Sequence, residues 1–309
     1  MKKLKIYLLS CGSHSDVVLE PIYEAFLERG HDAIIFHADI LTHPDLLTHT
    51  ELPEGTDVVF LASNAFNQRS VIEGRHVRSF FVPHGIGAEF WDPRMNSDTK
   101  VFLPGKQPWI PPLEVNNWKI VGWTKTDALH HPDREKIGYA KNLMEHLPFE
   151  QSVMFIPLAD SAGVPHAEFL IEYFQQKQIN IIIPFREYTQ AARKYFEGYP
   201  HIGFIEIQNL YYFVPYIKVL ICSGCTSVGR EFYITKVPVM HIYHGFPETR
   251  VVLNNPDVDI EHFDPLFSQV WNNPERFLQP ESVAEEFIGI NDGKVVERIV
   301  EEIEGGDND

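Results

Sequence analysis

The sequence has 309 residues, 44% of them apolar and 13% aromatic, which excludes a disordered chain and leaves room for two packed domains. The net charge is −17, from 26 basic and 43 acidic residues, and this excess disfavours nonspecific binding to nucleic acid or anionic lipid. The longest apolar runs are too short to cross a bilayer, so we expect no transmembrane segment, and peripheral membrane contact stays open as the less favoured alternative.

The cysteine content indicates the compartment. There are three cysteines, and the basic amino-terminal start is followed by only a brief apolar run, which is unlike a signal peptide. An odd, small number of cysteines in a long chain is typical of a reducing environment. We therefore expect a cytoplasmic protein, whose oligomeric state the sequence does not predict.

Apolar strand-like runs alternate with amphipathic stretches along the first half. Strands are predicted at 5–9, 33–36, 57–62, 79–82 and 119–122, and helices at 16–28 and 132–147. Ser15 or Asp16 is the predicted cap of the first helix. Residues 89–117 are rich in proline with little periodicity, so we expect loop there.

The second half shows the same alternation of strand-like and helical stretches, but its amino-acid sequence does not repeat that of the first half. Strands are predicted at 152–156, 180–183, 203–207, 219–222 and 237–242, and helices at 165–177, 187–196 and 292–304. Continuous Val/Ile/Leu runs between turns are typical of buried parallel strands. The sequence therefore predicts an α/β fold with two Rossmann-like doubly wound domains that face a cleft.

The expected domain limits follow from this alternation. Residues 1–147 form an amino-terminal Rossmann-like domain, and residues 148–290 form a second Rossmann-like domain. Residues 291–309 form a carboxy-terminal helix that packs back on the first domain, followed by an acidic tail.

The stretch ICSGCTSVGREF is the strongest candidate for a phosphate-binding turn. Ser223 and Gly224 are small enough to let backbone amides converge on an anion, and the hydroxyls of Thr226 and Ser227 add donors. Glu231, about one helical turn later, is placed to accept hydrogen bonds from a ribose. The alternative is that Thr226 or Ser227 only caps a helix.

The same stretch also has Cys222 and Cys225 at a spacing seen in metal and redox sites. A structural zinc ion needs four ligands, and the only other cysteine is Cys11. We therefore interpret these cysteines as buried small side chains and predict no metal site. No cofactor is predicted, and dependence on a divalent ion stays open.

The stretch FFVPHGIG contains the candidate general base. The imidazole of His84 has an ordinary pKa near ~6.5, so it can accept a hydroxyl proton at neutral pH. Gly85 and Gly87 let the backbone and a substrate approach closely. Ser13 and His14, in the loop after the first strand, are candidate acceptor-side residues. For both histidines the alternative is an ordinary loop residue.

Several motifs, in the same chain order, resemble the CDP-glycerol glycerophosphotransferase family. TSVGREF resembles its donor signature, with Thr226 and Ser227 at a hydroxyl pair and Glu231 in an acidic-aromatic pair. FVPHGIG resembles its His-Gly segment, which places the proposed base on His84. VGWTKTD resembles its Gly-Tyr-Pro-Arg-x-Asp segment, with Lys125 in place of arginine, and NDGKVVERIVEEI resembles its closing helix.

The resemblance implies the glycosyltransferase-B (GT-B) architecture and a transferase activity, with residues 1–147 as the acceptor domain and residues 148–290 as the nucleotide-donor domain. The enzyme would move a glycerophosphate or glycosyl group from a nucleotide-diphosphate donor, such as CDP-glycerol or a sugar nucleotide, to an acceptor hydroxyl. Such reactions build cell-surface polymers or glycans. The partners implied are two small molecules, a donor and an acceptor, and no nucleic acid.

The chain also departs from this family. Ile183–Pro184 stands where the family has His-Pro, and Arg186 is a candidate replacement for the missing phosphate contact. Glu89 stands where a lysine commonly follows the His-Gly segment. Lys125 is either a phosphate contact or an ordinary surface cation.

Two other functions stay open. A UDP-sugar 2-epimerase shares the architecture and a similar Ser-Gly turn, but the first loop, Cys11–Asp16, has none of the arginines expected of that family. The second is a nucleotide-binding protein without catalytic activity, which the departures from the transferase family would explain.

Overall fold

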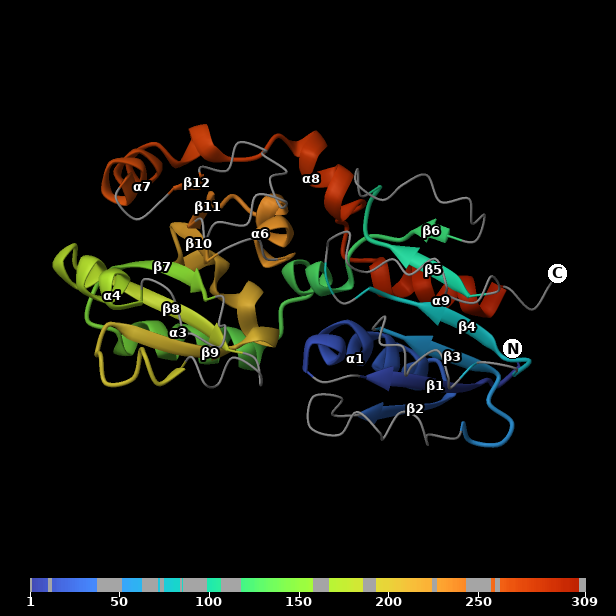
Figure 1. Cartoon of the computed structure of the whole chain (residues 1–309). Coiled ribbons are helices and arrows are strands. Elements are labelled where there is room, and N and C mark those ends of the chain that lie inside the picture. Colours follow the sequence, from blue (N-terminus) through green and yellow to red (C-terminus); the bar gives the residue numbers. More distant parts are fainter. Residues whose placement is uncertain are drawn as a thin grey trace. The chain divides into compact units, whose positions relative to one another are not determined.

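Figure 1 shows the computed structural model, in which the chain divides by its contacts into two compact units. Unit 1 comprises Met1–His130 with Glu285–Asp309, and unit 2 comprises His131–Ala284. The structure describes residues 2–10, 13–37, 52–62, 72, 75–83, 85, 99–106, 118–157, 167–185, 193–223, 227–242, 257–258 and 262–305. Among the described helices, none has the length and apolar character needed to span a membrane.

Unit 1 contains a parallel six-stranded sheet with the order β2-β1-β3-β4-β5-β6. Its strands are β1 (Lys5–Ser10), β2 (Asp32–His37), β3 (Val58–Leu61), β4 (Arg78–Phe81), β5 (Lys100–Leu103) and β6 (Trp118–Ile120). All four residues of β3 are buried, as are all but the first residue of β4 and β5. Because these central strands are covered on both faces, they are continuous apolar runs and do not alternate with polar residues.

A row of phenylalanine rings lies on one face of this sheet. Phe60 of β3, Phe80 of β4 and Phe102 of β5 stack with ring centroids 5.5 and 5.4 Å apart. Helix α1 (Ser13–Glu28) adds Phe26, whose ring centroid lies 5.8 Å from that of Phe60. Since all four rings are buried, they fix α1 on this face through packing area and ring geometry.

The last helix, α9 (Val295–Gly305), belongs to unit 1 and packs beside α1. Its buried residues recur at helical spacing: Val295, Ile299, Val300 and Ile303. This apolar stripe explains why the end of the chain returns to unit 1, since the stripe needs a surface to cover it.

Two carboxylates of α9 add ionic contacts to this packing. Glu302 accepts hydrogen bonds from Lys100 of β5 and Lys119 of β6, and these bonds hold the pKa of Glu302 below its usual value. The Oε1 atom of Glu304 lies 3.0 Å from Nε2 of His31, which is buried before β2. Helix α9 is therefore bonded to residues near both edges of the unit 1 sheet.

The segment that leads into α9 passes against the unit 1 backbone so closely that glycine is required. A Cβ atom on Gly289 would lie 2.0 Å from the carbonyl oxygen of Pro104, and one on Gly105 would lie 2.4 Å from that of Glu286. Gly289 also has a φ of +73°, which disfavours any other residue. Helix α8 (Glu281–Ile288) ends immediately before this contact.

We predict opposite effects for two glycine substitutions. Gly289→Ala should lower the free energy of unfolding by more than about 2 kcal/mol, because both the contact and the φ value oppose a side chain. Gly138→Ala is the matched control, since Gly138 lies inside α3 (Arg134–His146) and a Cβ atom there would have no atom within 4 Å. That change should raise the unfolding free energy by about 0.5–1 kcal/mol. Urea unfolding measures both, and equal effects would contradict the close approach.

Unit 2 contains a second parallel sheet, with the order β12-β11-β10-β7-β8-β9. Its strands are β7 (Gln151–Ile156), β8 (Ile179–Phe185), β9 (Ile202–Glu206), β10 (Val219–Ser223), β11 (Val239–Ile242) and β12 (Asp257–Val258). Its other elements include α3, α4 (Ala167–Gln176), α6 (Ser227–Glu231), α7 (Phe263–Asn272) and the 3-10 segments η5 (Ile207–Tyr216), η6 (Phe232–Ile234) and η9 (Pro274–Phe277).

Helices α4 and α7 pack together on the apolar core of this sheet. Phe174 of α4 lies against Phe263 and Phe267 of α7, with ring centroids 6.1 and 5.2 Å apart. The hydroxyl of Tyr173 donates to Asp264 at 2.6 Å, which lowers the pKa of that carboxyl. Burial is the main cause that raises the pKa of Tyr173.

The strand order of unit 2 locates a binding edge. When β7 is counted as the first strand, the order reads 3-2-1-4-5-6, as in a Rossmann sheet. The order reverses between β7 and β10, and ligands of such sheets bind beyond the carboxyl ends of the strands at this point. Those carboxyl ends are Ile156 and Ser223. In unit 1 the corresponding reversal lies between β1 and β3.

The predicted fold class of two Rossmann-like doubly wound domains is confirmed, and two local predictions are wrong. Residues predicted as loop contain β5, whose four residues are too few to show a period. Helix α1 begins at Ser13, so Ser15 and Asp16 lie inside it and neither is its cap. The helix predicted at 187–196 falls mostly outside the described residues. The domain boundary at residue 147 stays a prediction.

Candidate functional site

The predicted phosphate-binding turn, Ser223–Ser227, follows strand β10 at the reversal point of unit 2. Ser223 is the last residue of β10 and its side chain is fully buried, at 0% exposure. Ser227 is half-buried and begins α6. Gly224 and Thr226 lie between them, outside the described residues. The structure therefore puts both ends of the predicted phosphate turn at the edge where a Rossmann sheet binds its ligand.

Helix α6, which follows the predicted phosphate-binding turn, is short. It has five residues and is followed directly by the 3-10 turn η6. So short a helix has only a small dipole, because the dipole is the sum of few aligned peptide units. Any anion bound here would depend on hydroxyl and amide donors rather than on a long helix.

Glu231 ends α6, and its carboxylate is held by a second element. The side chain is 1% exposed, and Oε2 accepts a hydrogen bond of 3.1 Å from the hydroxyl of Tyr211 in η5. The ring of Tyr211 stacks on Phe232, with centroids 6.1 Å apart. Because a buried carboxylate needs donors, this tyrosine fixes both the place and the direction of Glu231. The sequence reasoning missed Tyr211, which lies 20 positions away in a segment without a motif.

The glycine of the TSVGREF stretch has a packing role that sequence reasoning also missed. A Cβ atom on Gly229 would lie 3.0 Å from Cε1 of His241 and 3.3 Å from Sγ of Cys222. These two residues face each other in the β10–β11 register. Cys222 is a fully buried thiol, as its interpretation as a small core side chain predicts. Within the described residues, no group of three His, Cys, Asp or Glu side chains could hold a metal ion.

The segment after β6 in unit 1 contains Lys125, a candidate donor contact. It lies in the 3-10 segment η3 (Thr124–Leu129) and is 7% exposed. Its Nζ atom is 5.1 Å from the ring centroid of Trp123, which is itself buried. The alternative that Lys125 is an ordinary surface cation is therefore wrong.

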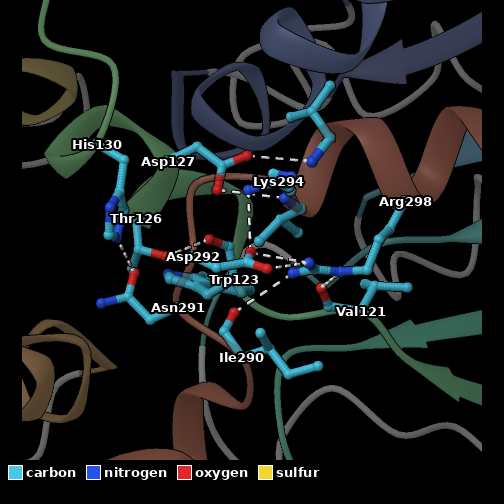
Figure 2. Close-up of polar contacts among 12 residues, drawn as sticks. Val121, Trp123, Thr126, Asp127, His130, Ile290, Asn291, Asp292, Lys294 and Arg298 are labelled. Atoms are coloured by element: carbon cyan, nitrogen blue, oxygen red, sulfur yellow. Dashed lines mark hydrogen bonds and ion pairs between the residues drawn. The ribbon is translucent and has the colours of Figure 1, made fainter.

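Figure 2 shows how the end of the chain holds this segment. The Asp127 carboxylate accepts hydrogen bonds from the first two backbone amides of α9, those of Val295 (3.3 Å) and Val296 (3.1 Å). These amides have no partner within their own helix, so Asp127 caps α9 from a distant part of the chain. Arg298 donates from Nε to the carbonyl oxygen of Val121 at 2.8 Å.

Gly122 is required at the same junction. Its φ is +97°, and a Cβ atom there would lie 2.5 Å from the carbonyl oxygen of Ile290. Arg298 also forms an ion pair with Asp292, with N–O distances of 2.8 and 3.0 Å. The segment before α9 therefore lies against the residues that lead into η3, the 3-10 segment that contains Lys125.

The remaining candidates are only partly described. Ser13 and His14 form the first turn of α1, and their side chains lie outside the described part of the structure. Gly85 is buried. His84 and Arg186 fall outside the described residues, so their roles stay predictions.

Comparison with solved structures supports the fold. No protein-family model and no curated protein matches the chain. The UDP-GlcNAc 2-epimerase of Methanocaldococcus jannaschii, solved with UDP-GlcNAc and UDP, has a TM-score of 0.63 and 17% identity over 99% of this chain and 100% of its own. A variant of the wall teichoic acid polymerase TagF, solved with CDPG, has a TM-score of 0.67 and 11% identity over 98% of this chain and 88% of its own.

A third structure is the UDP-GlcNAc 2-epimerase of Neisseria meningitidis bound to UDP-GlcNAc. Its TM-score is 0.63, with 12% identity over 98% of this chain and 100% of its own. These similarities extend over nearly the whole chain, including both sheets. The chain therefore has the GT-B type of fold, with two Rossmann-like sheets.

We predict that Tyr211 is needed to hold the Glu231 carboxylate. Tyr211→Phe should lower the free energy of unfolding by about 1.5–3 kcal/mol, because a buried carboxylate loses a donor. Tyr212→Phe is the matched control. It removes a hydroxyl from the next residue of η5 but keeps the ring beneath Lys136, so its effect should stay within about 0.5 kcal/mol. Thermal or urea unfolding compares the two variants, and equal costs would show that the bond to Glu231 contributes nothing.

Proposed function

We propose that the chain is a GT-B transferase that uses a nucleoside-diphosphate-linked donor, and that unit 2 binds the nucleotide. The observation that supports the proposal most is the position of the residues that follow β10. A serine-containing turn begins there, at the reversal of strand order, and leads within one short helix to the buried carboxylate of Glu231. The similarity in fold to proteins solved with UDP-GlcNAc or CDPG supports the same ligand class.

The nucleotide would be recognised by hydrogen-bond donors around its diphosphate and by a hydrogen-bond acceptor at its ribose. Hydroxyls of Ser223, Thr226 and Ser227, with the amide of Gly224, would donate to the diphosphate. The Glu231 carboxylate, held by Tyr211, would accept hydrogen bonds from the ribose hydroxyls. A protein with a net charge of −17 repels a diphosphate at long range, so local donors of this kind are required.

The transfer step would use a base on the first half of the chain. His84 would take the proton from the acceptor hydroxyl, and Ser13, His14 and Gly85 would lie on the acceptor side. Attack on the distal phosphorus forms a new P–O bond and releases a nucleoside monophosphate. Attack on an anomeric carbon forms a C–O bond and releases a nucleoside diphosphate. Lys125 or Arg186 would stabilise the leaving phosphate.

A second candidate is a UDP-sugar 2-epimerase. The similarity of this chain to two UDP-GlcNAc 2-epimerases covers 100% of each of those chains, which favours this alternative. The absence of arginine from Cys11–Asp16 counts against it. An epimerase converts a UDP-sugar with no acceptor present, whereas a transferase needs one, so incubation with UDP-GlcNAc alone separates the two.

Thermal-shift measurements with CMP, CDP, UDP and GDP test the binding proposal, because a ligand that binds only the folded state raises Tm. We expect one diphosphate to raise Tm, and Glu231→Gln to weaken its binding about tenfold or more. Glu206→Gln is the control. It changes an exposed carboxylate at the end of β9 in the same sheet and should leave binding unchanged.

The outcomes distinguish the three functions. Binding lost equally in both variants, or no binding of any nucleotide, would contradict the proposal. If a nucleotide binds, His84→Ala should abolish turnover while donor affinity stays within a few-fold. Tight binding without turnover over a panel of acceptors would favour a nucleotide-binding protein that has no catalytic activity.

A further inference from the structure

Two buried polar groups at the start of η3 have no hydrogen-bond partner. Trp123 and Thr124 are 1% and 3% exposed, and within the described part of the chain neither Nε1 of Trp123 nor Oγ1 of Thr124 finds a partner. They are consecutive residues, and Lys125 follows them directly. The segment therefore presents an indole N–H, a hydroxyl and an ammonium group in three successive positions.

Unpaired groups of this kind call for an explanation, because buried polar atoms in folded proteins nearly always have partners. Poor packing of the whole turn does not supply one. Thr126, two residues after Thr124, donates from Oγ1 to the carbonyl oxygen of Trp123 at 2.7 Å. Asp127 is bound by two amides of α9. Within this turn, the buried polar atoms without a hydrogen-bond partner are thus those of Trp123 and Thr124, whereas Thr126 and Asp127 have partners.

The chemistry of the three groups selects the missing partner. An indole N–H only donates, so its partner must be an acceptor, and a hydroxyl can donate to the same group. The ammonium of Lys125 lies 5.1 Å from the centroid of the Trp123 ring and favours an acceptor with negative charge. Asp127, the acidic residue of η3, is directed to the amides of α9 (Figure 2). These two donors and one cation have the chemistry that an oxyanion with several acceptor oxygens requires.

Helix α1, which packs against η3, contributes a related feature. The hydroxyl of Ser15 is fully buried and also lacks a partner among the described residues. The carboxylate of the next residue, Asp16, is engaged by Ser10 and by His37. The buried hydroxyls of Ser15 and Thr124 therefore lie on two elements that are in contact, and the nearby negative charge of Asp16 already has partners.

We infer that Trp123, Thr124 and Lys125 form a subsite in unit 1 for a phosphoryl group. The inference deepens the proposed function, because it gives a phosphate of a substrate a binding place outside the nucleotide turn of unit 2. The subsite lies beyond edge strand β6, not at the β1–β3 reversal of unit 1. Both unpaired atoms are shielded from solvent, so a phosphoryl group reaches them only when neighbouring side chains move.

A pair of threonine substitutions tests the subsite. Thr124→Val removes an unpaired hydroxyl at nearly constant volume, so Tm of the full chain should rise by a few degrees. The same change should weaken the binding of inorganic phosphate about tenfold, measured by the Tm shift against sodium chloride of equal ionic strength. Thr126→Val, the matched control in the same turn, removes a satisfied hydroxyl, so Tm should fall while phosphate binding is kept.

Three results would overturn the inference. Thr124→Val could lower Tm, which would mean that the hydroxyl has a structural partner such as a buried water. It could raise Tm and leave phosphate binding unchanged. The wild-type chain could also show no response to phosphate beyond that of the salt control. None of these results bears on nucleotide binding by Glu231 in unit 2, so the subsite and the proposed function can fail separately.

Discussion

The position of η3 in unit 1 depends on the contact between the Asp127 carboxylate and the first two amides of α9. Those amides are unsatisfied by their own helix, and the residue that satisfies them lies 168 positions earlier in the chain. Arg298 adds a bond from the same helix back to Val121, and Gly122 lets the two backbones approach. The end of the chain thereby fixes the turn that carries Lys125, so a structural contact determines where a candidate binding group lies.

Because the protein has a large negative net charge, its binding of any anion depends on local polar contacts. A net charge of −17 opposes the binding of a diphosphate, so binding must come from short-range contacts whose electrostatic interaction is little screened by solvent. Both units contain such groups in buried positions. In unit 2 the carboxylate of Glu231 is held by Tyr211, and α6 is too short for its dipole to replace hydroxyl donors. In unit 1 the ammonium of Lys125 lies beside an indole ring.

The fold could be predicted from the sequence because buried parallel strands are continuous apolar runs, and the five strands predicted for unit 2 match the structure within about two residues. The two-residue strand β12 was not predicted. The pattern failed where an element is too short to show a period, as in β5, and where an acidic residue suggested a cap, as at Asp16. In the candidate site, Ser223, Ser227 and Glu231 could be proposed together because they share one stretch of sequence. Tyr211 was missed because its contact with Glu231 is made only by the fold. The unpaired state of Trp123 and Thr124 is likewise a property of packing, which no motif records.

Hydrogen exchange followed by mass spectrometry on Asp127→Ala tests most directly whether the carboxy-terminal helix fixes η3. The account predicts faster exchange of the Val295 and Val296 amides together with those of residues 123–126, and unchanged exchange in the strands of unit 2. Faster exchange confined to the first turn of α9, with residues 123–126 as protected as in the wild type, would contradict it.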